Sequence, residues 1–464
     1  MTLQSSGPIS IGDVATEFGH LNYSLGNYRR VQSIAGSGLG NLPVDEGIPT
    51  SGQISFSDFY GKRLNVVVDC FSGGEETTTN VKNEKWNNNL TTVIGNFGKS
   101  RKEGGSKIIV AVNKTFKSEK NKPVTKCALR TGTWNSTAQI VVEVAGSGKI
   151  YGAGGNGGRG GWNSGRINYN TTPPSDPQVP GAPGGEGGGA LGVESNGTVV
   201  NVRSGGLILA GGGGGGGGGG QRETSGWGAR DGSGGGGGGG LGFPPGVGGA
   251  GGVQSNAGQP GNDGKAITSI GAVTSVGPYK PGYYRKVRSN TPGRSNEGGN
   301  NDASFEVSIN GSGNITSVTI ARRFTKEGSS YYARGTRFGG QNYEVGQTVI
   351  LVSDADNPFS GDGYSTTNVS FNITAIGGGF AGKGGENGGQ AYGARGGNGG
   401  DYGATGNDGL NGNVFDRHGA ASPYGIGGAG GAAGGAIRRA AGTSFTIGTN
   451  SGTITGSTDQ TGVQ

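Results

Sequence analysis

Few residues in this sequence have types and spacing that could do catalytic chemistry. The two histidines, His20 and His418, are too few for a histidine metal cluster or a two-histidine mechanism. Gly382-Lys383 does not complete a phosphate-binding loop, because Gly384 stands where Ser or Thr is required. No pair of carboxylates is singled out for glycan cleavage. We therefore expect that the protein is not an enzyme and has no cofactor.

Residues 354–363 come closest to a metal site. Asp354, Asp356 and Asp362 partly match the ligand order of a calcium loop, but their spacing departs from the known pattern. A plain turn is the simpler interpretation. We assign no metal site, and calcium binding at this position stays open.

Four segments combine aromatic and charged residues in a way that suits binding. Trp, Tyr and Arg dominate binding hot spots, and aromatic rings can stack on sugar faces. The candidate binding residues are Trp162 and Tyr169 in 162–183, Trp227 and Arg230 in 221–231, Tyr283, Tyr284 and Arg285 in 277–294, and Asp416, Arg417, His418 and Tyr424 in 413–424. The same aromatics could instead seal the ends of a scaffold; for the set as a whole we favour binding, on loops.

The glycine content indicates what positions these loops. Glycine supplies 111 of the 464 residues, while 30% are hydrophobic and 15% are charged. Disordered chains are usually richer in charge and poorer in aromatics. A collagen helix is excluded by the lack of a Gly-X-Y period and by the low proline content of 17 residues.

Long glycine runs need a compensating interaction to become ordered. Glycine loses more backbone entropy on folding than any other residue, about 1–2 kcal/mol for the backbone of a residue. Extended helices with three residues per turn leave every N–H and C=O free to bond to neighbouring segments. We expect a bundle of such helices, sandwiched between short strands and displaying loops at its ends. The main glycine blocks are 152–161, 184–189, 211–220, 234–240 and 377–400.

A repeated phrase links these blocks. Each copy begins with a small residue and an aliphatic residue, continues with a stretch of alternating polar and apolar residues, and ends with Gly-x-Ile. Copies begin at Ala128-Leu129, Ala190-Leu191 and Ala436-Ile437, with a degenerate copy at Ala266-Ile267. Repetition of this kind predicts one structural unit stacked several times.

The predicted fold class is mainly β with polyglycine-II helices. A hairpin signal around Asn310-Gly311, with further strands at 343–351 and 369–376, predicts a compact β domain inserted in the glycine-rich part. The predicted organisation is an N-terminal segment 1–63, a β domain 64–150, a glycine-rich region 151–297, an inserted β domain 298–376 and a glycine-rich C-terminal region 377–464.

The first 63 residues contain an internal echo. Ile9-Ser10-Ile11-Gly12-Asp13-Val14 matches Ile54-Ser55-Phe56-Ser57-Asp58-Phe59, and Ser followed three residues later by Asp is a helix-start pattern. We expect short helices at 10–18 and 55–60. A segment this small can hardly build a core alone, so we expect it to dock onto something larger.

The distribution of charge limits the kinds of partner that the protein could bind. The net charge is +7, with much of the excess between Lys99 and Lys126. Lysines that guard strand edges are the simpler explanation, and attraction to an acidic surface is the alternative. No compact basic stripe with stacking aromatics indicates nucleic acid, and two Arg-Gly-Gly matches are too few for an RNA-binding tract.

Cys70 and Cys127 lie in β-like surroundings, where buried free thiols are favoured over a disulfide. The start of the chain lacks the basic and apolar regions of a signal peptide, and no window has the ~20 apolar residues of a membrane span. We therefore expect synthesis in the cytoplasm.

The Ile-Ser-x-x-Asp segments, each followed by Phe-Gly or Tyr-Gly, resemble the amino-terminal segments of many tailed-phage virion proteins. The blocks from Gly152 onward resemble the glycine-rich tail-fibre adhesins of T-even-like phages and the fibre proteins of cyanophages. That resemblance implies a polyglycine-II sandwich whose distal loops recognise a host receptor, either a surface glycan or an outer-membrane protein. The inserted β domain and the different attachment region depart from those adhesins.

The resemblance also implies a virion location, made in the host cytoplasm, with attachment to other virion proteins through the N-terminal segment. It leaves a homotrimer open and gives no role to nucleic acid. The attachment candidates are Ile9, Ile11, Asp13, Phe18, Ile54, Phe56, Asp58, Phe59 and Tyr60. The alternative is a purely structural virion component, such as a capsid fibre or baseplate element.

Overall fold

A computed structural model covers residues 1–464. The residues that the structure describes are 3–19, 23–29, 31–33, 36–39, 41–43, 47–87, 93–95, 103–119, 125–163, 178–222, 231–232, 234–252, 267–275, 277–289, 304–320, 322–327, 330–337, 348–352, 363–365, 369–376, 394–411 and 425–463. In these ranges, no helix has the length and apolar character needed to cross a bilayer.

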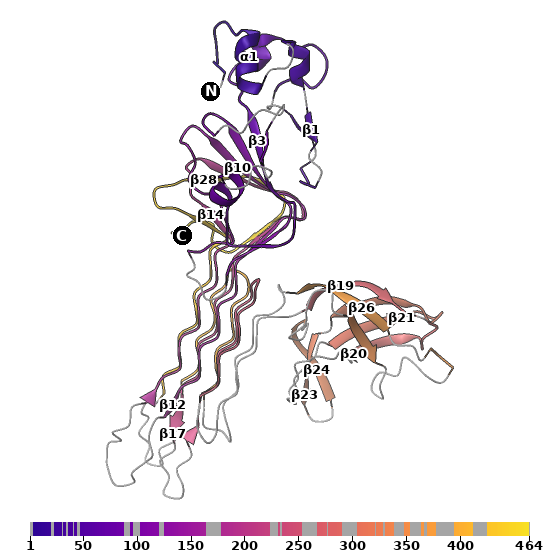
Figure 1. Cartoon of the computed structure of the whole chain (residues 1–464). Helices are drawn as coiled ribbons and strands as arrows, with labels where there is room; N and C mark the ends of the chain where they lie inside the picture. The colour runs from indigo at the N-terminus through magenta and orange to yellow at the C-terminus, as the bar shows by residue number, and fades with distance from the viewer. Residues whose placement is uncertain are drawn as a thin grey trace, which may run out of the picture. The chain divides into compact units, whose positions relative to one another are not determined.

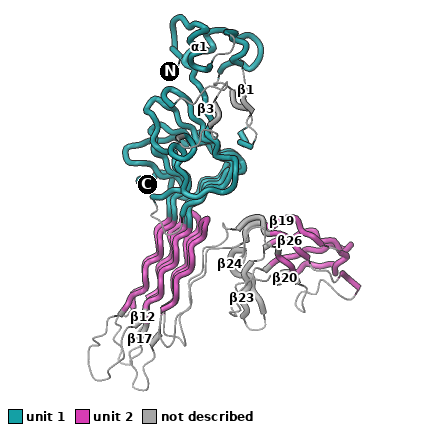
Figure 2. Tube along the Cα trace, in the orientation of Figure 1, with its two compact units in different colours: residues 1–153, 188–211, 434–464 teal, residues 154–187, 212–433 magenta. Residues whose placement is uncertain are grey.

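The chain divides into two compact units, coloured separately in Figure 2. Unit 1 comprises Met1–Ala153, Gly188–Gly211 and Gly434–Gln464, and unit 2 comprises Gly154–Gly187 and Gly212–Ala433. The chain therefore passes between the two units four times. Both units are mainly β.

Unit 1 is built on three parallel sheets, part of which is seen in Figure 1. The first contains β3 (Asn65–Cys70), β7 (Lys107–Val112), β10 (Gln139–Val144), β15 (Thr198–Val202) and β28 (Phe445–Asn450), with β6 (Val93–Gly95) antiparallel at its edge. The second contains β4 (Glu76–Thr77), β8 (Thr115–Lys117), β11 (Lys149–Tyr151), β16 (Leu207–Leu209) and β29 (Thr453–Thr455). The third contains β5 (Thr79–Asn80), β9 (Leu129–Arg130), β14 (Leu191–Val193), β27 (Ile437–Arg439) and β30 (Gln460–Thr461).

The chain visits these sheets in a constant rotation, first to second to third, which is the arrangement of a parallel β-helix. Equivalent residues of successive turns are in register, as in Val142, which lies opposite Val110 and Val200. All three side chains are fully buried in one hydrophobic core. Stacked β-branched residues therefore hold the turns together.

This register explains the repeated phrase. Leu129, Leu191 and Ile437 occupy equivalent positions of the third sheet, so the three main copies are successive turns of one stacked unit, as predicted. The prediction of a degenerate fourth copy at Ala266-Ile267 was wrong, because β19 (Ile267–Thr274) belongs to an antiparallel sheet in unit 2. Alternation predicts a strand but does not distinguish parallel from antiparallel pairing.

The N-terminal segment of unit 1 contains α1 (Ile11–Phe18), η1 (Leu25–Arg29), β1 (Val31–Ser33), β2 (Asn41–Pro43) and η2 (Phe56–Phe59); the helix η3 (Val81–Asn87) lies further along. Both predicted helix starts are confirmed, with Asp13 bonded to the Ser10 N–H at 2.8 Å and Asp58 to the Ser55 N–H at 2.7 Å. The core of this segment is continuous with that of the β-helix, and the Glu17 carboxylate accepts the Leu64 N–H at 2.8 Å.

Unit 2 contains an antiparallel sheet in the order β19-β26-β25-β20-β21-β22. The remaining bounds are β20 (Gly282–Ser289), β21 (Ser304–Ile309), β22 (Ile315–Ile320), β25 (Thr348–Val352) and β26 (Val369–Ile376), with a separate hairpin of β23 (Arg322–Glu327) and β24 (Ser330–Arg337). The predicted hairpin around Asn310 is confirmed as β21–β22. The sheet also includes β19 and β20, which precede the boundary predicted at residue 298.

Candidate functional site

The rest of the described part of unit 2 is a bundle of glycine-rich segments that run side by side (Figure 1). Segment 212–220 is its centre. Its N–H groups donate with a three-residue period at 2.7–3.0 Å: 212, 215 and 218 to segment 234–241, 214 and 217 to segment 181–187, and 213, 216 and 219 to segment 404–411. Successive residues thus point at three different neighbours.

The carbonyls of the central segment accept from three further segments with the same period. The donors are 155, 158 and 161 in segment 154–161, 428 and 431 in segment 425–433, and 394, 397 and 400 in segment 394–400. Among the described segments the centre therefore has six neighbours. Each neighbour is also bonded to the next around the ring, as Gly185 is to Asn156 and Gly406 to Gly431. Segment 246–252 lies outside the ring and bonds to 234–241.

Close packing on every side explains why the centre is pure glycine. A Cβ on Gly214 would lie 1.9 Å from the Asn156 carbonyl oxygen, and one on Gly216 would lie 1.8 Å from that of Gly428. Ring segments other than 234–241 have an open side and carry side chains there at every third position. Examples are Asn156 and Arg159 in one segment, Pro183 and Glu186 in another, and Ile426, Ala429 and Ala432 in a third.

Hydrogen-bond registers also give the direction of each segment. Segments 154–161, 246–252 and 404–411 run with the centre, whereas 181–187, 234–241, 394–400 and 425–433 run against it. One end of the bundle, which we call the loop end, therefore gathers residues 161, 181, 220, 234, 252, 394, 411 and 425. The described residues that flank the stretches 164–177, 223–230, 253–393 and 412–424 in the chain lie at or next to this loop end.

Two short hairpin stems mark the loop end. β12 (Trp162–Asn163) pairs with β13 (Gln178–Val179), and β17 (Gln221–Arg222) pairs with β18 (Asp231–Gly232). Trp162 is the predicted binding residue that falls in these stems. Tyr169, Trp227, Arg230, Asp416, Arg417, His418 and Tyr424 lie outside the described residues, within stretches whose flanks meet at the loop end.

The fourth predicted loop is different. Tyr283, Tyr284 and Arg285 lie in β20 of the antiparallel sheet, so placing them on a loop was wrong. The Tyr283 side chain is 53% exposed. Tyr284 packs against the sheet's core and its hydroxyl donates to the Lys280 carbonyl at 2.9 Å. Burial raises the pKa of Tyr284, and the nearby Tyr364 adds to the effect.

Most of the predicted attachment residues stabilise the N-terminal segment itself. Phe18 and Phe59 are fully buried and pack edge to face at 6.1 Å between ring centroids. Ile9, Ile11 and Ile54 are half-buried against the same core, Asp13 and Asp58 cap helices, and the Tyr60 hydroxyl donates to the Gly7 carbonyl at 2.5 Å. Phe56 is the exception, because 39% of it is exposed.

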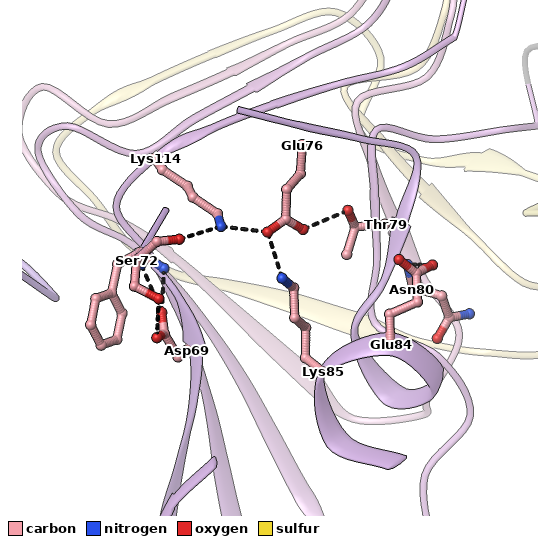
Figure 3. A network of polar contacts seen from close by, with 9 residues as sticks. Asp69, Ser72, Glu76, Thr79, Asn80, Glu84, Lys85 and Lys114 are labelled. Atoms are coloured by element: carbon pink, nitrogen blue, oxygen red, sulfur yellow. Dashed lines mark hydrogen bonds and ion pairs between the residues drawn. The ribbon is translucent and has the colours of Figure 1, made fainter. Parts of the chain in front are cut away.

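Figure 3 shows a polar cluster in unit 1 whose residue types would suit acid–base chemistry. Glu76 accepts hydrogen bonds from Lys85, Lys114 and Thr79. Burial acts to raise the pKa of Glu76, but these hydrogen bonds outweigh it and hold the pKa below its ordinary value. An ionised carboxylate with three donors is held in place as an acceptor. The cluster therefore ties β4, β5 and Lys114, which directly precedes β8, to η3.

Sequence reasoning missed the polar side chains that finish the bundle's edge. Asp408 accepts the Gly430 N–H at 2.7 Å, Asn411 accepts the Gly427 N–H at 2.8 Å, and Asn156 accepts the Val247 N–H at 3.0 Å. Each side-chain oxygen accepts a backbone N–H of the adjacent segment. A sequence signal for such residues is available: Asn or Asp residues that recur three positions apart within a glycine-rich segment, as Asp408 and Asn411 do.

Other candidate chemistry is limited in the described residues. No group of three or more His, Cys, Asp or Glu side chains there could hold a metal ion. The predicted calcium ligands Asp354, Asp356 and Asp362 lie outside the described residues. Cys70 and Cys127 are free and buried, and burial raises the pKa of each thiol to about 12.

No protein-family model matches the chain, and no curated protein or solved structure matches it either.

Proposed function

We propose that this protein is a tailed-phage virion protein, a tail-fibre or fibre-tip adhesin that binds a host-cell receptor through the loop end of the glycine bundle. The observation that carries the proposal is that the flanks of several candidate stretches lie together. Seven of the eleven predicted binding residues belong to stretches whose flanking residues lie at the loop end of a densely hydrogen-bonded scaffold. Recognition loops on a rigid scaffold are a common solution for binding.

The scaffold segments are, in this proposal, polyglycine-II helices. Their three-residue bonding period is that of the extended left-handed helix, which forms no bonds within itself. Six hydrogen-bonded neighbours around segment 212–220 offset the entropy lost by the glycines. The partner would be a surface glycan or an outer-membrane protein, because aromatic and charged loop residues suit both.

Attachment to other virion proteins is assigned to the N-terminal segment. Its buried aromatics leave Phe56 and Tyr23 as large exposed hydrophobic side chains, at 39% and 63% exposure. We expect Phe56→Ser to reduce incorporation into virions while the segment still folds, since Phe59 and Phe18 supply its core.

Adsorption of virions to host cells tests the adhesin directly. Residues 223–230 are replaced by Asn-Gly, which can close a two-residue hairpin between β17 and β18. A second variant lacks residues 413–423, and Thr405→Ala, an exposed substitution on segment 404–411, is the matched control. We expect normal incorporation of all three proteins and loss of adsorption in the two loop variants. Normal adsorption by both would instead favour the purely structural virion component.

A further inference from the structure

The glycine segments keep the register of the β-helix strands that they continue. β11 and β16 pair with Tyr151 opposite Leu209, and directly afterwards in unit 1 the Gly152 N–H donates to the Leu209 carbonyl. In unit 2, residues 155, 158 and 161 donate to 212, 215 and 218, at the same separation in sequence. The pairing changes from strand spacing to a three-residue period without a slip.

The same continuity of register is found where glycine segments lead into strands of the third sheet. β14 and β27 pair with Leu191 opposite Ile437, and the Ala190 N–H donates to the Gly435 carbonyl in unit 1. In unit 2, residues 181, 184 and 187 donate to 426, 429 and 432, again at the same separation. The same continuity holds for an antiparallel pair, in which Gly434 bonds to Gly211 in unit 1 and Gly431 to Gly214 in unit 2.

Glycine runs cannot set such a register themselves. Register is specified where side chains distinguish one alignment from the next, and it is weakly specified in glycine-rich segments. Segment 212–220 has no side chain at all. Side chains of the ring such as Asn156 exclude a shift of one residue, so the choice between alignments three residues apart must come from elements at one end of the segments, either the β-helix strands or the stems at the loop end.

The β-helix strands are the better source. Ile150 and Ile208, and likewise Leu191 and Ile437, are fully buried side chains stacked in register next to the first glycines. The stems β12–β13 and β17–β18 are two residues long in each strand. Longer buried ladders discriminate better between alignments.

We propose that the β-helix is a template that sets the register of the glycine bundle, and thereby determines which positions face outward and where the loops emerge. A shift of one residue is sterically excluded once the template is formed. It would place Asn156 at the position of Gly155, where a Cβ lies 2.0 Å from the Gly185 carbonyl oxygen. A shift of three residues keeps every outward position outward.

Deletions at the two ends of segment 154–161 test the template in the full-length chain. One variant lacks Gly154, next to the β-helix side; the matched variant lacks Gly161, at the loop end; a third lacks the triplet 154–156. Hydrogen exchange at residues 212–220 reports the bundle, and exchange at β10 reports the β-helix in the same sample. This readout does not depend on receptor binding.

Deletion of Gly154 should accelerate exchange across 212–220 by at least about tenfold, because the whole segment is out of phase. Deletion of Gly161 should affect only the last bonds near Gly218, and the triplet deletion should leave protection in place. Equal protection in the two single deletions would overturn the proposal, and the reverse asymmetry would assign the template to the loop end. If deletion of Gly154 also unfolds β10, deletion of Gly161 decides alone: protection retained at residues 212–215 supports the template, and loss of protection across 212–220 refutes it.

Discussion

The β-helix and the glycine bundle solve the same packing problem with opposite use of side chains. In the β-helix, an inner strand such as β10 pairs with two neighbouring strands, and buried columns such as Val110, Val142 and Val200 fill the interior. In the bundle, the central segment 212–220 contacts six neighbours in the described chain and consists of backbone alone. Removing every side chain allows three times as many neighbours.

The two regions should therefore fail in different ways when they are mutated. A smaller side chain leaves a cavity in the β-helix, and its cost depends on how well the site can collapse. An added side chain in the bundle meets carbonyl oxygens that belong to bonded backbone, which cannot move without breaking a neighbour's bonds. Tolerance should follow burial in the first region and position in the three-residue period in the second.

Gly214→Ala should have the largest effect. The new Cβ would lie 1.9 Å from the Asn156 carbonyl oxygen, so segments 154–161 and 212–220 must separate. We expect a destabilisation above about 4 kcal/mol, in the exceptional range for a point mutation. Hydrogen exchange at 212–220 would measure it.

Ala429→Ser is the matched control for Gly214→Ala, because it adds one atom at an exposed outward position of the bundle. We expect exchange rates close to those of the wild type. If Gly214→Ala were tolerated as well as Ala429→Ser, the segments of the bundle would be packed less tightly than their hydrogen bonds indicate.

Ile150→Ala should have the next largest effect. Ile150 is fully buried and aligned with Phe116 and Ile208, and loss of a buried Ile side chain costs about 2–5 kcal/mol. Ile454→Ala removes the same atoms from the same column at the last described turn, where the side chain is half-buried. Thermal unfolding should show a smaller drop for Ile454→Ala. Equal decreases in melting temperature would mean that burial does not determine how much each side chain of the column contributes to stability.

The sequence allowed much of the β-helix to be anticipated, but not its topology. Repeated phrases at Leu129, Leu191 and Ile437 predicted a stacked unit, since equivalent turns need equivalent buried residues. Those phrases do not show that the strands of 188–211 and 434–464 pair in parallel with the strands of residues 64–150. Parallel pairing across long insertions leaves no local signal, because the residues that specify it are far apart in the chain.

For the bundle, composition predicted glycine segments bonded to each other but could not give their neighbours. Outward positions such as Asn156 and Glu186 do show the three-residue period once the segments are aligned. The candidate loops were readable as stretches rich in Trp, Tyr and Arg. The loop at Tyr283 was misassigned because tyrosines and arginines also suit an exposed strand such as β20.

Polar side chains sharpen the contrast between the regions at a smaller scale, because in the β-helix they act from partly buried positions. Glu76 bonds to Lys85, Lys114 and Thr79, and its pKa in the folded protein lies below the ordinary 4.5. A carboxyl with a lowered pKa contributes stability that is complete above its unfolded-state pKa and is lost as the pH falls through the folded-state pKa. The melting temperature of Glu76→Gln should therefore lie below that of the wild type at pH 7, and the difference should shrink as the pH falls below 4.5.

Glu75→Gln is the matched control for Glu76→Gln, because the Glu75 side chain is 49% exposed and pairs with Lys117 alone among the described ion pairs. Solvent screens such a pair, so its removal should change the melting temperature less at every pH. A Glu76→Gln difference that stays constant from pH 7 to pH 3 would show that the lysines are held by packing and not by the carboxylate.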